Sequence, residues 1–378
     1  MPASSLPPPT SYFPALTGVR AVAAYLVFFH HFNPFPAEGS TRLLHNICRE
    51  LHIGVPVFFV LSGFLITLRY ANAYQWNGRW WREYLRNRVA RIYPMYFLLT
   101  CLSYGWNYAD TGEFSTWKWL ANLTFVRGFF EALIYSGVAQ GWTLTVEECF
   151  YLFAPVAFWL LTRPRVRLWP LPFILLAVGC GLVWLLGPLG WHGLFANFKF
   201  MLRFTFFGRC FEFFAGMQLA YWYQQGRLRH YGWPAALTTT GSLLTAAALA
   251  GMVWTRGGYT YGQEHPFGVM LNNVVLPGGI MTLFAGLLTE PSGLRRLLAT
   301  PLLQVLGKSS YIFYLIHLGY LQSFLRKQLG FENELVSLAV EFLLLNLLAV
   351  ALYYSVEKHL NSRIRRHPAT RQQHLAPA

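Results

Sequence analysis

The chain has 378 residues, of which 55% are hydrophobic and only 12% are charged. Soluble domains carry about 25% charged residues, so this composition excludes an ordinary soluble protein and indicates an integral membrane protein. The formal net charge of +15 does not indicate nucleic-acid binding, because the basic residues gather in short loops between apolar runs, as they do in membrane proteins.

Ten apolar segments are long enough to cross about 30 Å of hydrocarbon as helices. A leader, residues 1–15, lacks the basic start of a cleavable signal peptide, and a basic tail, residues 358–378, follows the last segment. The predicted spans are residues 16–32, 51–70, 89–106, 144–161, 168–187, 200–223, 234–254, 267–289, 301–324 and 335–356. The expected fold class is all-α, an integral membrane protein with about ten transmembrane helices that enclose a polar tunnel.

Arginine-rich and arginine-poor loops alternate between these segments. Residues 69–91 contain six arginines and residues 163–167 contain three, whereas residues 42–49, in an opposite loop, contain two. Because basic loops stay in the cytoplasm, the alternation predicts that both termini are cytoplasmic. We expect a multi-pass protein of a bacterial-type inner membrane, surrounded by membrane lipid.

The first span carries Arg20 near its start and His30 and His31 near its end. Ionisable groups within a span are costly and indicate function by default. On a helix, Arg20 and His31 lie within about 20° of one stripe and about 16 Å apart along the axis, whereas His30 lies about 80° away. We therefore expect His31 to act as a general base. The alternative, interfacial histidines with a snorkelling arginine, stays open.

The stretch from residue 81 to residue 97 is the second candidate. Arg88 and Arg91 are spaced i, i+3 and point the same way on a helix, and Arg86 extends the basic patch toward the cytoplasm. Guanidinium groups suit phosphate recognition, so the patch indicates a phosphorylated cofactor that enters from the cytoplasm. Ordinary anchoring by positive charges is the alternative.

Two later spans also carry polar side chains. Glu147 and Glu148 begin the fourth span, where a carboxylate either completes a charge network or is simply favoured by the helix dipole. Tyr311 and His317 recur at helical spacing in the ninth span, either as site residues or as part of an aromatic face.

Small residues mark the second span. Gly54, Ser62 and Gly63 permit close helix packing. Ser62 is also a weak candidate nucleophile, because the G-x-S-x-G context of serine hydrolases is missing.

Five motifs in this order resemble the membrane-bound acyltransferase-3 family, in its stand-alone form. The motifs are LTGVRAVAAYLVFFHHF, GVPVFFVLSGFLIT, RNRVARIYPMY, GWTLTVEECFYL and LGKSSYIFYLIH. The resemblance implies an acyltransferase domain over residues 16–357 that O-acylates glycans, lipid-linked sugars or macrolide-type products. Two residues depart from the family pattern: Thr17 stands where the family commonly has Asp, and Pro56 stands where it commonly has Asp or Asn.

The resemblance also implies the participants of the reaction. Acyl-CoA, with acetyl-CoA the expected form, is a cytoplasmic co-substrate, and no permanently bound cofactor or metal is expected. The acceptor is a hydroxyl of a sugar, glycan, lipid-linked saccharide or similar molecule. The family pattern selects His31 as the base and Glu147 as the acidic residue that orients it or holds an arginine. The phosphate-binding residues are then Arg20, Arg86, Arg88 and Arg91.

Two alternatives remain at this point. Transfer could be direct or pass through an acyl-histidine. A transporter or flippase of a lipid-linked sugar or anionic substrate would also need buried charges, but it predicts inverted repeats, and the sequence has no internal repeat.

Overall fold

The computed structural model of the protein describes residues 12–228, 235–329 and 331–365. Within these ranges the chain forms α-helices, short 3-10 turns and two π-helical turns, and no β-strand, which confirms the all-α prediction. Residues 1–11 of the predicted leader and residues 366–378 of the predicted basic tail lie outside the described residues.

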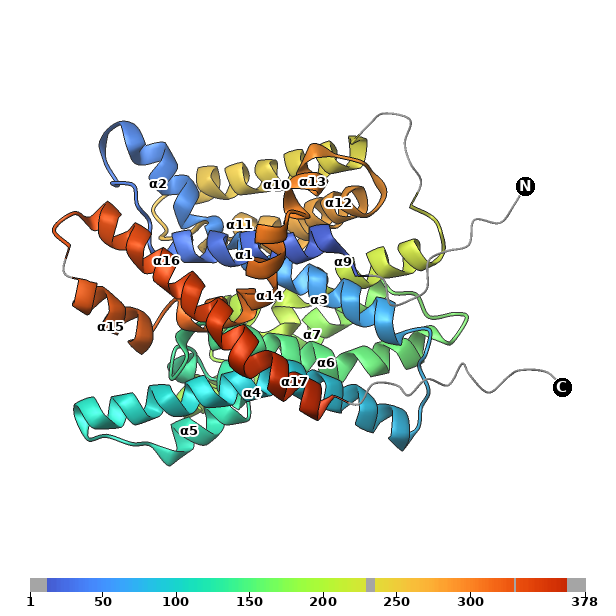
Figure 1. Ribbon diagram of the computed structural model, residues 1–378. Helices are drawn as coiled ribbons and strands as arrows, with labels where there is room; N and C mark the ends of the chain where they lie inside the picture. The colour runs from blue at the N-terminus through green and yellow to red at the C-terminus, as the bar shows by residue number, and fades with distance from the viewer. Residues whose placement is uncertain (1–11, 229–234, 330, 366–378) are drawn as a thin grey trace.

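Ten long helices build a bundle, and seven shorter helices connect or flank them within the described ranges (Figure 1). The long helices are α1 (Pro14–His31), α3 (Gly54–Tyr70), α4 (Gly78–Thr111), α6 (Trp142–Leu161), α7 (Pro170–Leu186), α9 (Phe206–Gln224), α10 (Ala236–Thr255), α12 (Leu276–Thr289), α14 (Pro301–Ile316) and α16 (Glu334–Leu352). The shorter ones are α2 (Arg42–Arg49), α5 (Thr116–Leu123), α8 (Phe198–Phe204), α11 (Pro266–Met270), α13 (Gly293–Leu298), α15 (Tyr320–Leu329) and α17 (Lys358–Ile364). Helix α16 crosses the bundle obliquely, so that α17 reaches α4 (Figure 1).

Six helical stretches of the described chain are long and apolar enough to cross a membrane. They are Gly39–Tyr70, Ala139–Leu161, Pro170–Leu189, Ala236–Thr255, Pro266–Thr289 and Glu334–Ile364. Each contains most of one predicted span. The other four predicted spans overlap helices α1, α4, α9 and α14, which are shorter or more polar.

Two predicted spans are interrupted. Residues 200–223 do not form one helix, because Thr205 adopts an extended conformation (φ −113°, ψ 158°) between α8 and α9. Residues 301–324 are also not continuous, because α14 ends at Ile316. Gly319 follows with a φ of 108°, a conformation that glycine adopts at no steric cost.

Helix α3 packs closely against α1 and α9 through glycines. A Cβ atom on Gly63 would lie 2.1 Å from the carbonyl oxygen of Phe213, and one on Gly54 would lie 2.2 Å from that of Ala23. No side chain fits at such distances, so these small residues allow the backbones to approach, as in many membrane proteins. The packing role predicted for Gly54 and Gly63 is confirmed.

A stack of aromatic rings joins the three helices that build one wall of the site. Phe213 of α9 lies between Phe59 of α3 and Phe150 of α6, with ring centroids 4.7 and 4.4 Å apart. All three side chains are fully buried. Offset-stacked aromatic pairs add rigidity beyond their buried area, so α3 and α6 are held at a fixed spacing where their polar side chains meet.

Candidate active site

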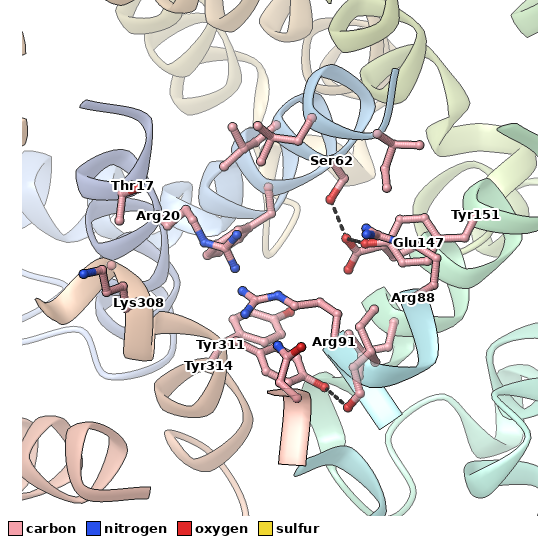
Figure 2. A pocket seen from close by; sticks show the side chains of 18 of the residues that line it. Thr17, Arg20, Ser62, Arg88, Arg91, Glu147, Tyr151, Lys308, Tyr311 and Tyr314 are labelled. Atoms are coloured by element: carbon pink, nitrogen blue, oxygen red, sulfur yellow. Dashed lines mark hydrogen bonds between the residues drawn. The ribbon is translucent and has the colours of Figure 1, made fainter. Parts of the chain in front are cut away.

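A cavity of about 780 Å³ lies between α1, α3, α4, α6, α14 and the C-terminal helices (Figure 2). Among the described residues that line it, Glu147 is the only carboxylate. Seven cations line the same space: Arg20, Arg69, Arg88, Arg91, Lys308, Lys358 and Arg365. A concave surface with so large an excess of positive charge attracts a polyanion.

Arg88 is the most enclosed of these cations. It is buried, its guanidinium carbon lies 5.3 Å from the ring centroid of Tyr70 and 5.4 Å from that of Tyr151, and its Nη2 donates a hydrogen bond to the Tyr70 hydroxyl at 3.2 Å. Its Nε has no hydrogen-bond partner among the described residues. The two rings therefore hold the guanidinium plane in place at the wall of the cavity.

Arg20 and Arg91 face each other across the cavity (Figure 2). Nη1 of Arg91 lies 2.8 Å from Oε1 of Glu357, and its guanidinium carbon lies 5.7 Å from the Tyr311 ring centroid. Nε of Arg20 has no hydrogen-bond partner among the described residues. The structure therefore brings Arg20, Arg88 and Arg91, three of the predicted phosphate-binding residues, to one cavity.

Two arginines near the C-terminal helix α17 differ in their placement. Burial, together with the nearby positive charges of Arg69, Arg91 and Arg88, lowers the pKa of Arg365 to about 10. Arg365 therefore remains positively charged at neutral pH. Arg86, predicted to bind phosphate, does not line the cavity. Its Nε instead donates a hydrogen bond to the backbone carbonyl of Ile364, which fastens α17 to α4.

Glu147 lies on the cavity wall formed by α3 and α6. Its Oε1 accepts hydrogen bonds from the hydroxyls of Ser62 and Tyr151. Because the Tyr151 ring also lies over Arg88, the carboxylate belongs to the cationic network. It makes no hydrogen bond to His31 within the described chain. Glu148 does not line the cavity.

Tyrosines of α14 form another wall. The Tyr311 hydroxyl donates to the backbone carbonyl of Ile92 at 2.8 Å, which joins α14 to α4. Tyr314 lies at the end of the cavity farther along α14, where its hydroxyl is 3.0 Å from Oγ1 of Thr143. Both tyrosines are buried, so their hydroxyls are the polar features of an otherwise apolar and aromatic inner end.

His31 and His317 lie together beyond Tyr314, outside the cavity lining. The ring centroid of His317 is 5.5 Å from that of Tyr314, and Nε2 of His317 is 3.2 Å from Nδ1 of His31. Nδ1 of His31 is also 2.9 Å from the carbonyl oxygen of Val27. His31 is the last residue of α1 and is exposed, whereas His317 is fully buried.

His30 points elsewhere. Its Nδ1 is 2.6 Å from the carbonyl oxygen of Arg49, and its ring contacts His52 and Tyr261, with centroids 5.3 and 5.0 Å away. His52 in turn is paired with the fully buried Glu50 at 3.1 Å. The side chains of His30 and His31 therefore point to different surroundings, as their positions on the helix imply.

Four lining cations had no site role in the sequence prediction: Arg69, Lys308, Lys358 and Arg365. Arg69 lies at the end of a span and Lys358 and Arg365 follow the last span, so all three resembled ordinary loop charges. Lys308 could have been noticed, because it is the single lysine or arginine within the motif LGKSSYIFYLIH and lies inside a predicted span. The contact between α17 and α4 (Figure 1) is a tertiary contact that no local sequence pattern predicts.

Comparisons with known proteins agree with the sequence motifs. Acyltransferase MdmB of Streptomyces mycarofaciens is 29% identical over 375 residues, which cover 92% of this chain and 89% of that protein. Peptidoglycan O-acetyltransferase OatA of Listeria monocytogenes is 27% identical over 186 residues, which cover 46% of this chain and 28% of that protein. No solved structure matches the chain.

The sequence model of the family, described as an acyltransferase domain, matches residues 13–357. This range includes the helices that line the cavity up to the end of α16 and both histidines of the His31–His317 pair. The chain therefore belongs to the acyltransferase-3 family, as its five motifs predicted.

Proposed function

We propose that the protein is an integral membrane O-acyltransferase that moves a short acyl group from acyl-CoA to the hydroxyl of a sugar, glycan, lipid-linked saccharide or similar acceptor. Membership of the acyltransferase-3 family supports acyl transfer, and the name of OatA supports an oxygen acceptor. The observation that carries the proposal is the cationic cavity whose inner end approaches a histidine pair.

The donor in this proposal is acyl-CoA, with acetyl-CoA the first form to test. Its phosphates are strong acceptors that match guanidinium donors, and Arg20, Arg88 and Arg91 offer such donors from three walls of one space. The narrow pantetheine arm then follows the apolar side of the cavity past Phe58 toward Tyr314. This arrangement directs the thioester toward the histidine pair.

His31 is the general base in this proposal. The carbonyl oxygen of Val27 can only accept a hydrogen bond, so Nδ1 of His31, 2.9 Å away, carries the proton of the neutral ring. Nε2 is then the basic nitrogen. As the acceptor oxygen attacks the thioester carbonyl carbon, its proton passes to Nε2. The C–S bond breaks, and the departing thiolate of CoA takes that proton.

Glu147 has a different role from the one expected for a partner of the base. Its contacts with Ser62 and Tyr151 support the alternative that it holds the arginine network. A carboxylate in the middle of several cations lowers their mutual repulsion while the cavity is empty of donor.

We propose ten membrane spans, formed by α1, α3, α4, α6, α7, α9, α10, α12, α14 and α16, around a polar tunnel that includes the cavity. Both termini then lie in the cytoplasm of a cell with a bacterial-type inner membrane. In support, three lining cations lie near span ends that this topology places on the cytoplasmic side. They are Arg20 early in α1, Arg69 late in α3 and Arg365 after α17. Donor would therefore enter from the cytoplasm.

Two measurements on the full chain test the proposal. Purified protein in lipid nanodiscs, given acetyl-CoA and an extract of cells that lack the protein, is expected to release CoA and acetylate a component of the extract. Mass spectrometry of glycans and small molecules, compared between cells with and without the protein, identifies the acceptor. Binding of acetyl-CoA without thioester cleavage would overturn the proposal in favour of transport.

A further inference from the structure

The ring of His317 is held in one orientation at the end of α14. It is fully buried, stacks on Phe313 with an interplanar angle of 8° and a centroid distance of 6.1 Å, and places Nδ1 2.7 Å from the carbonyl oxygen of Tyr314. Nε2 of Gln140 donates to the same carbonyl at 2.7 Å. A ring fixed at its edge and its face has little freedom to turn.

The hydrogen-bonding network assigns the protons of both rings. Because the Tyr314 carbonyl can only accept, Nδ1 of His317 carries the proton, and in the neutral ring Nε2 has the free lone pair. That lone pair lies 3.2 Å from Nδ1 of His31, which carries a proton by the argument from Val27. The one Nδ1–H of His31 is therefore shared between two acceptors, the Val27 carbonyl oxygen at 2.9 Å and Nε2 of His317 at 3.2 Å. The chain of contacts runs from His31 through His317 to Tyr314.

We propose that His317 is a positioning residue for His31: it accepts the Nδ1–H hydrogen bond together with the Val27 carbonyl, fixes the orientation of the ring and so keeps Nε2 of His31 as the proton acceptor. This inference rests on the proposed function. When Nε2 takes the proton of the acceptor hydroxyl, the imidazolium of His31 donates through Nδ1 to the neutral Nε2 of His317. Hydrogen bonds from a charged donor are shorter and stronger than neutral ones, so the contact strengthens as the charge appears.

The geometry excludes the reverse assignment of roles. Both ring nitrogens of His317 are occupied, one by the Tyr314 carbonyl and one by His31, and the side chain is fully buried. His31 is exposed, and its Nε2 has no hydrogen-bond partner in the described part of the chain. Only His31 can present a basic nitrogen to a substrate.

The chain of contacts also reaches the cavity. The Tyr314 hydroxyl lines the inner end and lies 3.0 Å from Thr143 and 3.3 Å from the carbonyl oxygen of Gln140. The same residue therefore touches the donor space with its side chain and fixes His317 with its backbone. This places the base at a set distance from the end of the cavity.

The test compares His317→Leu with His317→Gln in the nanodisc assay, with acetyl-CoA as donor and the extract of cells that lack the protein as acceptor source. The Leu variant cannot accept a hydrogen bond, and we expect kcat to fall about tenfold to a hundredfold while KM for acetyl-CoA is unchanged. In the Gln variant the side-chain oxygen can accept from His31 and the amide can donate to Tyr314, so kcat is expected to recover most of the loss. Equal kcat in the two variants would overturn the inference, as would a change confined to KM.

Ring-nitrogen NMR of selectively labelled histidines in the unmodified protein keeps the inference testable if a variant does not fold. Protonation of His31 at Nδ1 is expected, and protonation at Nε2 would overturn it. Failure of the two proposals is distinguishable. Full activity of His31→Ala would exclude His31 as the base and so overturn both proposals. An inactive His31→Ala together with a fully active His317→Leu would exclude only the positioning role of His317.

Discussion

Replacing Arg88 by lysine separates the shape of this cation from its charge. Lysine keeps the positive charge but loses the planar fork, the contact with the rings of Tyr70 and Tyr151 at 5.3 and 5.4 Å, and the hydrogen bond to Tyr70. A flexible ammonium group is not held by two rings, so its position toward a phosphate is less defined.

The size of the effect follows from the donor capacity that Arg88 leaves free. The guanidinium hydrogens that Arg88 does not use for Tyr70 can make a two-pronged contact with a phosphate, and a lysine can replace one prong. A hydrogen bond to a charged group contributes about 1.5–3 kcal/mol, and about 1.4 kcal/mol corresponds to a tenfold change in affinity. The Kd for acetyl-CoA should therefore rise by about tenfold to a hundredfold.

Equilibrium binding of acetyl-CoA to the purified protein measures this change. Arg82→Lys is the matched control, because Arg82 lies on the same helix, is exposed and does not line the cavity. The reasoning would be refuted by an unchanged Kd in Arg88→Lys, or by an equal rise in Arg82→Lys.

Three further predictions concern the scaffold and the network. In Gly63→Ala the new Cβ would lie 2.1 Å from the Phe213 carbonyl oxygen, so the variant should unfold at a lower temperature in detergent than Gly181→Ala, whose Cβ meets nothing within 4 Å; equal melting would contradict the packing argument. Glu357→Gln removes the carboxylate partner of Arg91 and should cost about 1–3 kcal/mol of stability, whereas Glu332→Gln, at an exposed position, should cost nothing measurable in the same thermal assay. Ser62→Ala removes one of the two hydrogen bonds to Glu147 and should reduce kcat/KM only about threefold to tenfold; complete loss of activity with normal folding would instead indicate a nucleophile.

Sequence reasoning could relate residues that share one helix, because helical phase determines which of them lie on one face. Arg20 and His31 could be assigned to one stripe because α1 is continuous from Pro14 to His31, and helical phase separates His30 without any tertiary knowledge. Arg88 and Arg91 share the cavity for the same reason. Arg86 shows the limit of the reasoning, since a residue two positions before Arg88 lies on another face of α4 and there meets Ile364.

Contacts between distant segments could not be predicted. The partner of His31 is 286 positions away in the chain, and the partners of Glu147 come from α3 and from its own helix. Arg365 joins the site only because α16 and α17 cross the bundle to α4. A loop arginine and a site arginine have the same local sequence signal, and only the packing of helices tells them apart.

The central claim is that this chain cleaves an acyl-CoA thioester with His31 as the base. The most direct measurement is transfer of an isotopically labelled acetyl group from acetyl-CoA by the full-length protein, compared with His31→Ala and His30→Ala of confirmed folding. We expect His30→Ala to transfer label at the unmodified rate, because Nδ1 of His30 is hydrogen-bonded to the backbone carbonyl of Arg49. We expect His31→Ala to be slower by about a hundredfold to ten-thousandfold. Transfer by His31→Ala at the unmodified rate would contradict the role of His31 as the general base.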